Sequence, residues 1–202
     1  MRINRNSGSI ALVMITLLVS CIFTGCGEKE VEGVSGCVIG KDGSVEATIV
    51  RDFDQSLYDV GELKSMMDEE IRTYNFDHAG DRISAGDVEC TDGVLTCVID
   101  YASGDDYAEF NTRRFVIEEF EEAMASDLVR VSVKSVPDLE QTDLKTLEDT
   151  SHLYVLITDE PGYVTFPGKV RYFSDGVERI TKKQIHVTDD MDGLAYIIYE
   201  SK

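Results

Sequence analysis

Hydrophobic and polar residues follow clear periodic patterns through most of the chain after residue 43. Between residues 44 and 52, apolar side chains occupy every second position, which predicts a β-strand. From Asp59, which has Glu62 three residues later, apolar positions recur every three to four residues as far as Phe76. An acceptor side chain followed three residues later by Glu is typical of a helix start. The pattern therefore predicts an amphipathic helix over 59–76 with one buried stripe.

A β-hairpin is predicted after this helix. Its turn is Asp92-Gly93, and the flanking strands are 86–91 and 94–101. In this register Cys90 faces Leu95, and Cys97 lies one diagonal step away on the same face. Such diagonal pairs are about 7–8 Å apart, which is too far for easy disulfide formation. We therefore expect both cysteines to be buried free thiols.

Two further helices are predicted before the pattern changes. Ser103 and Asp106 repeat the helix-start spacing, and the predicted short helix ends near Asn111. Residues 116–125 place Ile117, Phe120 and Met124 on one helical face, which predicts another helix.

Beyond Leu128 the apolar period changes from 3.6 to 2. Gly, Pro and Asp turn sequences separate most of the resulting segments, and short connections of this kind join antiparallel neighbours. The pattern over residues 137–151 predicts a loop or a short helix around Leu144 and Leu147. The predicted class is α+β, with an N-terminal strand-helix-hairpin-helix half followed by a C-terminal antiparallel β-meander. The predicted strands are 128–136, 153–158, 163–166, 170–173, 177–180, 184–187 and 194–199.

The first 26 residues have a different pattern. Arg2 and Arg5 precede an apolar run over 10–19, and the chain turns polar directly after Cys26. An export signal typically starts with positive charge, continues with a short apolar core and ends with small residues before the sequence turns polar. The run is too short and interrupted for a transmembrane helix of roughly 20 apolar residues.

The segment Phe23-Thr24-Gly25-Cys26 resembles the bacterial lipoprotein signal, although Phe23 stands where that family prefers Leu. The resemblance implies cleavage before Cys26 and a diacylglyceryl group on its sulfur. Two acyl chains anchor a protein stably where one binds marginally. Cys21, after Leu18-Val19-Ser20, is the rival lipidation site, and a plain secretory signal or an uncleaved anchor is the other alternative. Each of these readings places the body of the chain outside the cytoplasmic membrane.

The predicted organisation has four parts. Residues 1–25 are the signal peptide, 26–40 a flexible tether rich in Gly and Glu, 41–136 an α+β region and 137–202 the meander region. Whether the last two pack as one domain is left open. Lipidation at Cys26 would leave Cys37, Cys90 and Cys97, an odd number that cannot complete a disulfide framework.

The 202-residue chain carries 19 Lys and Arg against 39 Asp and Glu, a net charge of −20. Removal of residues 1–25, which hold two Arg and no acid, would make it −22. This charge repels phosphate backbones and excludes nucleic acid as a partner. A macromolecular partner would instead present basic residues, as a basic envelope protein or peptide does, and its association would weaken with salt.

Several segments are similar to those of a family of small lipid-anchored surface lipoproteins from clostridial Gram-positive bacteria. They begin at Tyr58, Asp92, Asp106, Pro167 and Ala195, with sequences YDVGELKSMMDEEI, DGV, DYAEFN, PGKVRYFSDGV and AYIIYE. The family has no assigned activity, so the resemblance implies location and fold only. After DYAEFN the chain departs from the family's small residue and Gly, because Arg113 to Glu118 stand there.

Catalytic and metal-binding patterns are weak in this sequence. His78, His152 and His186 stand alone, and no GxSxG, SxxK or phosphate-loop motif occurs. We expect no cofactor and no enzymatic activity. Residues 188–193 approximate the start of a calcium loop, but Thr188 and Tyr199 occupy positions where acidic ligands are needed. A polar turn is favoured, with weak calcium binding at Asp189, Asp190 or Asp192 as a lesser hypothesis.

Aromatic residues gather in the meander region as Tyr163, Phe166, Tyr172 and Phe173. Core packing is the favoured interpretation over a carbohydrate platform. The expected function is that of a non-enzymatic binding or interaction module, anchored to the outer face of the cytoplasmic membrane. The alternative is a small accessory protein that handles a solute or a glycan for an envelope machine. This alternative includes accessory proteins that act by hydrolysis. A cation-responsive structural protein is a third reading.

Overall fold

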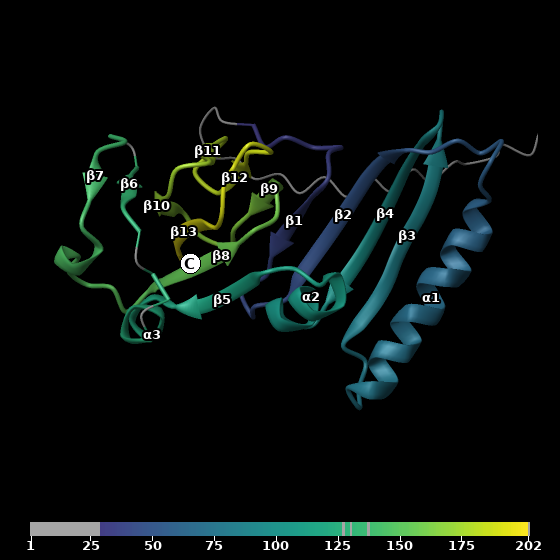
Figure 1. The fold of residues 1–202 in the computed structure, drawn as a ribbon, viewed down its shortest axis with the longest axis horizontal. Helices are drawn as coiled ribbons and strands as arrows, with labels where there is room; N and C mark the ends of the chain where they lie inside the picture. Colours follow the sequence, from purple (N-terminus) through teal and green to yellow (C-terminus); the bar gives the residue numbers. More distant parts are fainter. Residues whose placement is uncertain (1–28, 127, 130, 137, 202) are drawn as a thin grey trace, which may run out of the picture.

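Thirteen strands and three α-helices make up the part of the chain that the computed structural model describes, residues 29–126, 128–129, 131–136 and 138–201. The strands form one sheet of seven and one of six (Figure 1). The α+β class is therefore confirmed, although most of the regular structure is β and the N-terminal half is not rich in helix.

The seven-stranded sheet draws its strands from both halves of the chain. Its neighbouring strands are antiparallel except for the parallel pair β1 and β9. Gly36 occupies the first position of that pair, where a Cβ would overlap the carbonyl oxygen of Tyr163. In spatial order the strands are β11 (Val177–Arg179), β12 (Gln184–Val187), β9 (Gly162–Thr165), β1 (Gly36–Ile39), β2 (Val45–Asp52), β4 (Val94–Tyr101) and β3 (Ile83–Thr91).

The six-stranded sheet is antiparallel throughout. Its order is β5 (Phe115–Glu119), β8 (Leu153–Thr158), β13 (Ala195–Glu200), β10 (Val170–Phe173), β6 (Val133–Ser135) and β7 (Gln141–Thr142).

The centre of the six-stranded sheet is covered on both faces. Val155, Leu156 and Ile157 are consecutive in β8, and all three are fully buried. A strand with one face in solvent would alternate buried and exposed residues, so both faces of β8 must be covered. Leu156 packs in a core between the two sheets, whereas Val155 and Ile157 pack in a second core together with Phe120. The second core is closed by α3 (Phe120–Ala125) and by the 3-10 helix η1 (Leu144–Thr146).

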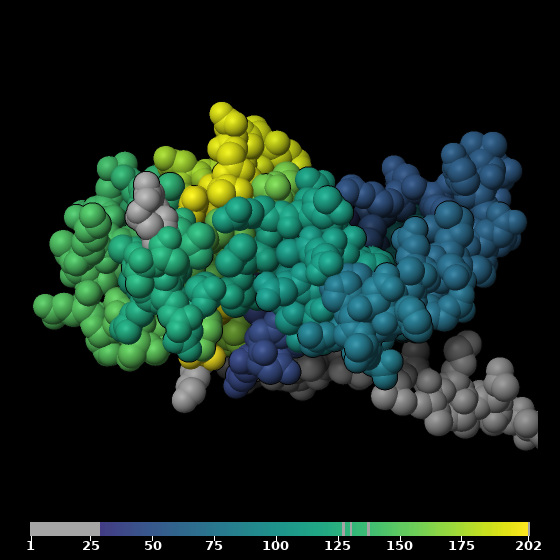
Figure 2. All heavy atoms as spheres, turned by 60° about the horizontal axis from the view of Figure 1, so that its bottom comes forward, coloured from purple at the N-terminus to yellow at the C-terminus, as the bar shows by residue number. Residues whose placement is uncertain are grey.

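Helix α1 (Val60–Asp77) begins as predicted, because the Asp59 side chain accepts a hydrogen bond from the backbone N–H of Glu62 at 2.9 Å. It packs on the seven-stranded sheet, where Met67 Sδ lies 3.4 Å from the Sγ of Cys97. In Figures 1 and 2 α1 forms one end of an elongated molecule, and the green segment with β7 lies at the other end.

Helix α2 (Gly104–Asn111) also begins at its predicted cap, Ser103. Its buried Asp106 accepts hydrogen bonds from the Ser103 hydroxyl at 2.6 Å and from the Tyr74 hydroxyl at 3.2 Å. The Nε of Arg82 lies 3.7 Å from the same carboxylate. This cluster joins α2 to the C-terminal end of α1.

Three local predictions are wrong. Residues 116–119 belong to β5 and only 120–125 are helical, because Phe115–Glu119 pairs with the edge of β8. The strand predicted over 128–136 is reduced to β6. The tether predicted over 26–40 contains β1, because Cys37 and Ile39 are core residues. Ahead of β1, the backbone of Val31 exchanges two hydrogen bonds with the side chain of Gln184.

The order of the C-terminal strands also differs from that of a simple meander. Strands β8, β10 and β13 lie in one sheet, whereas β9, β11 and β12 lie in the other. The chain crosses from one sheet to the other after β8, β9, β10 and β12, and each sheet covers the other's apolar face. Most C-terminal pairings are antiparallel as predicted, but only β6–β7 and β11–β12 join consecutive strands.

Candidate functional site

A cavity of about 190 Å³ lies where the seven-stranded sheet faces α2, β5 and the loop between β8 and β9. Strand β2 creates the opening, because it continues beyond Thr48, the last residue paired with β1. Ile49 and Arg51 follow on this stretch, which pairs with β4 but not with β1, and line the cavity. Glu160 and Pro161, in the loop after β8, line it as well.

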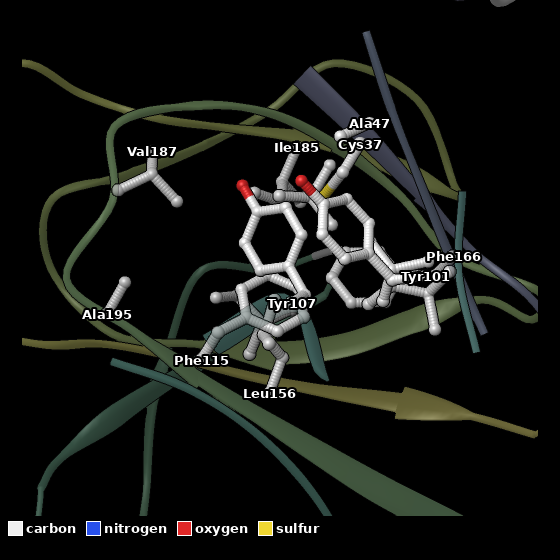
Figure 3. Packing of buried hydrophobic residues seen from close by; sticks show 14 of the residues in the cluster. Cys37, Ala47, Tyr101, Tyr107, Phe115, Leu156, Phe166, Ile185, Val187 and Ala195 are labelled. Atoms are coloured by element: carbon white, nitrogen blue, oxygen red, sulfur yellow. The ribbon is translucent and has the colours of Figure 1, made fainter. Parts of the chain in front are cut away.

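Aromatic side chains form much of the cavity wall. The rings of Tyr101 and Tyr107 meet edge to face with centroids 5.0 Å apart, and Tyr107 lies 4.6 Å from the ring of Phe115. Figure 3 shows the hydroxyl ends of both tyrosines pointing to the same side, toward Cys37. All four residues are at least nine-tenths buried.

Polar groups are fixed in this apolar wall by hydrogen bonds. The Tyr107 hydroxyl donates to Glu160 Oε2 at 2.7 Å. The Asn111 amide donates to the Tyr101 hydroxyl at 3.1 Å and to the Tyr107 carbonyl at 2.8 Å. The backbone N–H of Glu160 donates to Thr158 Oγ1 at 3.1 Å, which holds the loop at the mouth. The cavity therefore offers pre-positioned donors and acceptors, as ligand sites do.

Burial keeps the thiol and the two phenol groups of the cavity wall protonated. Desolvation, followed by the nearby charge of Glu160, raises the pKa of the Cys37 thiol from 9.0 to about 12. Desolvation also raises the pKa of Tyr101 to about 12 and that of Tyr107 further. Because the thiolate is the nucleophilic form of cysteine, Cys37 is inert at neutral pH. This arrangement is suited to binding and not to nucleophilic attack.

The lipidation candidates Cys26 and Cys21 lie outside the described residues. The other cysteines are free, as expected for Cys90 and Cys97. Cys90 pairs with Leu95 across the hairpin, and the turn residues Asp92 and Gly93 have φ of +52° and +79°, the two positive values that this turn needs. Cys97 is buried, but Cys90 is only half-buried.

The structure keeps the three histidines apart. His78 stacks on Tyr74 and its Nε2 lies 3.2 Å from Glu109, His152 lies 3.9 Å from Asp149, and His186 stacks on Tyr163. Within the described ranges, no three His, Cys, Asp or Glu side chains are placed to hold a metal ion. Asp189 and Asp190 lie in a turn, and Gly193 has the positive φ of +91° expected there.

The aromatic residues of the meander region do not form one platform. Phe166 and Phe173 are buried in the core between the sheets, and Tyr172 packs against the second core. Tyr163 lines the cavity. Core packing was therefore the better prediction for the two phenylalanines.

Sequence reasoning did not identify the cavity residues. Tyr101, Tyr107, Asn111, Glu160 and Arg51 come from four separate segments and share no motif. The one local signal was the turn sequence Glu160-Pro161-Gly162, which indicates a loop but not its role.

Comparison of the chain with protein-family models, with curated proteins and with solved structures finds no match. The resemblance to clostridial surface lipoproteins therefore stays a prediction. Across the described residues, no helix has the length and apolar character needed to cross a membrane.

Proposed function

We propose that this chain is a lipid-anchored binding module on the outer face of the cytoplasmic membrane, and that its cavity takes a small solute. The cavity carries the binding part of this proposal, because buried hydroxyls and a carboxylate converge on a space bounded by aromatic rings. Its size favours solute handling over docking of a flat protein surface. The protonated state of Cys37 supports binding over covalent catalysis.

The anchoring part depends on the sequence before residue 27. Arg2 and Arg5, the apolar run over 10–19 and the polar change after Cys26 support an exported lipoprotein. A diacylglyceryl group would hold the body at the bilayer surface. The net charge of −22 after cleavage would repel anionic headgroups, so the lipid and not the protein surface would provide the membrane affinity.

Membrane fractionation of cells that produce the full chain tests the anchor. We expect wild type and Cys21→Ser to sediment with membranes and Cys26→Ser to lose the lipid. Mass spectrometry of the purified chain should show a diacylglyceryl adduct and an N-terminus at Cys26. A chain that still begins at Met1, or an unmodified Cys26 sulfur in a mature chain, would overturn this proposal.

A further inference from the structure

Two opposite charges face the cavity without neutralising each other. Arg51 lies on the end of β2 that extends beyond β1, and Glu160 lies on the loop after β8. No ion pair of 4.0 Å or less joins them, and no carboxylate of the described chain pairs with Arg51. Arg113 and Arg114 also have no carboxylate partner among the described residues, but of these three arginines only Arg51 lines this cavity. Both charges are instead available to a ligand in the cavity.

We propose that the cavity binds a small zwitterion of the size of a free amino acid, with its ammonium group at Glu160 and its carboxylate at Arg51. This rests on the proposed binding function and names the ligand class. A guanidinium matches a carboxylate with two parallel hydrogen bonds, and charge-assisted bonds are about twice as strong as neutral ones. Glu160 already accepts the Tyr107 hydroxyl through Oε2, which fixes the carboxylate and leaves Oε1 for the ammonium.

The apolar wall of the cavity suits a short apolar side chain, which would branch from the carbon that carries both charged groups. Ile49, Tyr101, Tyr107 and Phe115 supply the apolar wall. The volume of about 190 Å³ is below the roughly 300–1,000 Å³ of sites for drug-sized ligands. The Tyr101 hydroxyl accepts from Asn111, and its own hydrogen has no acceptor among the described residues, so it can donate to a ligand oxygen.

Other small ligands fit the charges less well. An anion such as phosphate would meet Arg51 but would be repelled by Glu160. A metal ion would find a single carboxylate, since the described residues contain no cluster of three metal-ligating side chains. A neutral apolar compound would leave both charges unpaired while displacing their water, which costs free energy.

Isothermal titration calorimetry on the purified full chain in detergent tests the ligand class. The probes are glycine, L-alanine and L-leucine, with N-acetyl-L-leucine and L-leucinamide as analogues that each lack one charge. We expect saturable binding of at least one zwitterion at or below about 1 mM. Each analogue of leucine should bind about tenfold or more weakly than leucine, or not at all.

Two variants assign the charges. Arg51→Gln should weaken binding of the zwitterion about tenfold and leave any weak binding of L-leucinamide unchanged. Glu160→Gln should also weaken binding of the zwitterion about tenfold, but it should leave any weak binding of N-acetyl-L-leucine unchanged. Arg72→Gln on α1 and Glu148→Gln are matched controls, because both side chains are exposed and neither lines the cavity. Circular dichroism shows whether each variant is folded.

Three results would overturn the inference. These are no saturable binding of any zwitterion up to about 1 mM, equal binding of leucine and its singly charged analogues, and unchanged affinity in Arg51→Gln. Fractionation of whole cells tests the anchor separately, so a failure of the ligand class and a failure of the proposed location are distinguishable. Equal binding of all three leucine compounds would leave the binding function standing and remove only the zwitterion.

Discussion

The buried thiol of Cys37 makes the protein's stability dependent on alkaline pH. Cys37 is 8% exposed, and its pKa is raised from 9.0 to about 12 in the folded state. A raised folded pKa contributes stability that is fully present below the unfolded value of 9.0 and is lost as pH rises toward about 12. The replacement Cys37→Ala removes this group and therefore its pH dependence.

The size of the effect follows from the two pKa values. At about pH 8 the thiol is mostly protonated in both states, so its ionisation hardly alters the free energy of unfolding. At about pH 10 the unfolded thiol is mostly ionised and the folded one is not, which stabilises the unfolded chain by about 1.4 kcal/mol. Wild type should therefore lose about 1.4 kcal/mol more than Cys37→Ala between these pH values. Ionisation of Tyr101 and Tyr107 affects both proteins alike and cancels in the comparison.

Urea unfolding of the full chain followed by far-ultraviolet circular dichroism measures this difference. Cys90→Ala is the matched control, because Cys90 is only half-buried and lies outside the cavity. We expect the free energies of unfolding of wild type and Cys90→Ala to fall in parallel with pH, and that of Cys37→Ala to fall less steeply. Parallel curves for wild type and Cys37→Ala would refute the desolvated thiol, and with it the argument that the cavity has no nucleophile at neutral pH.

Three further substitutions test the packing, each measured as a change in the urea midpoint. Gly168→Ala should destabilise the protein by about 1–3 kcal/mol, because its Cβ would lie 2.6 Å from the carbonyl carbon of Glu200. Gly80→Ala is the control, because the space around Gly80 is open, and it should not destabilise the protein. Equal effects of the two variants would contradict the close approach of Gly168 to the backbone of Glu200. Ile157→Ala should cost about 2–5 kcal/mol because the side chain is fully buried, whereas Val38→Ala, at 45% exposure, should change stability by less than about 1 kcal/mol. Asp106→Ala should lower the free energy of unfolding by about 1–3 kcal/mol, because it leaves the Ser103 and Tyr74 hydroxyls without their acceptor. Asp105 is an exposed neighbour, and an equal or larger loss in Asp105→Ala would count against the buried cluster.

Local patterns were enough to predict the elements whose stability is local. Asp59 and Ser103 cap α1 and α2 as predicted, and Asp92-Gly93 forms the predicted hairpin turn. These features depend on residues within four positions of one another, so their signal is complete in a short stretch of sequence. The α+β class follows from the same periodicities.

Tertiary pairing decided what short stretches could not. Residues 116–119 begin the segment with helical spacing, but they belong to β5 because the edge of β8 supplies backbone partners. Cys37 and Ile39 stand in a stretch rich in Gly and Glu, yet β1 is fixed between β2 and β9. Strand order is a non-local property, because a period of two says which face is buried but not which strand lies alongside.

The cavity shows the same division. By itself the sequence determined the acidic charge, the caps, the turns and the lipoprotein-like start of the chain. Only the folded structure brought Arg51, Tyr107 and Glu160 to one space, across separations of more than 50 residues. The protonation of Cys37 was equally invisible in the sequence, because desolvation comes from neighbours that only the packing of two sheets supplies.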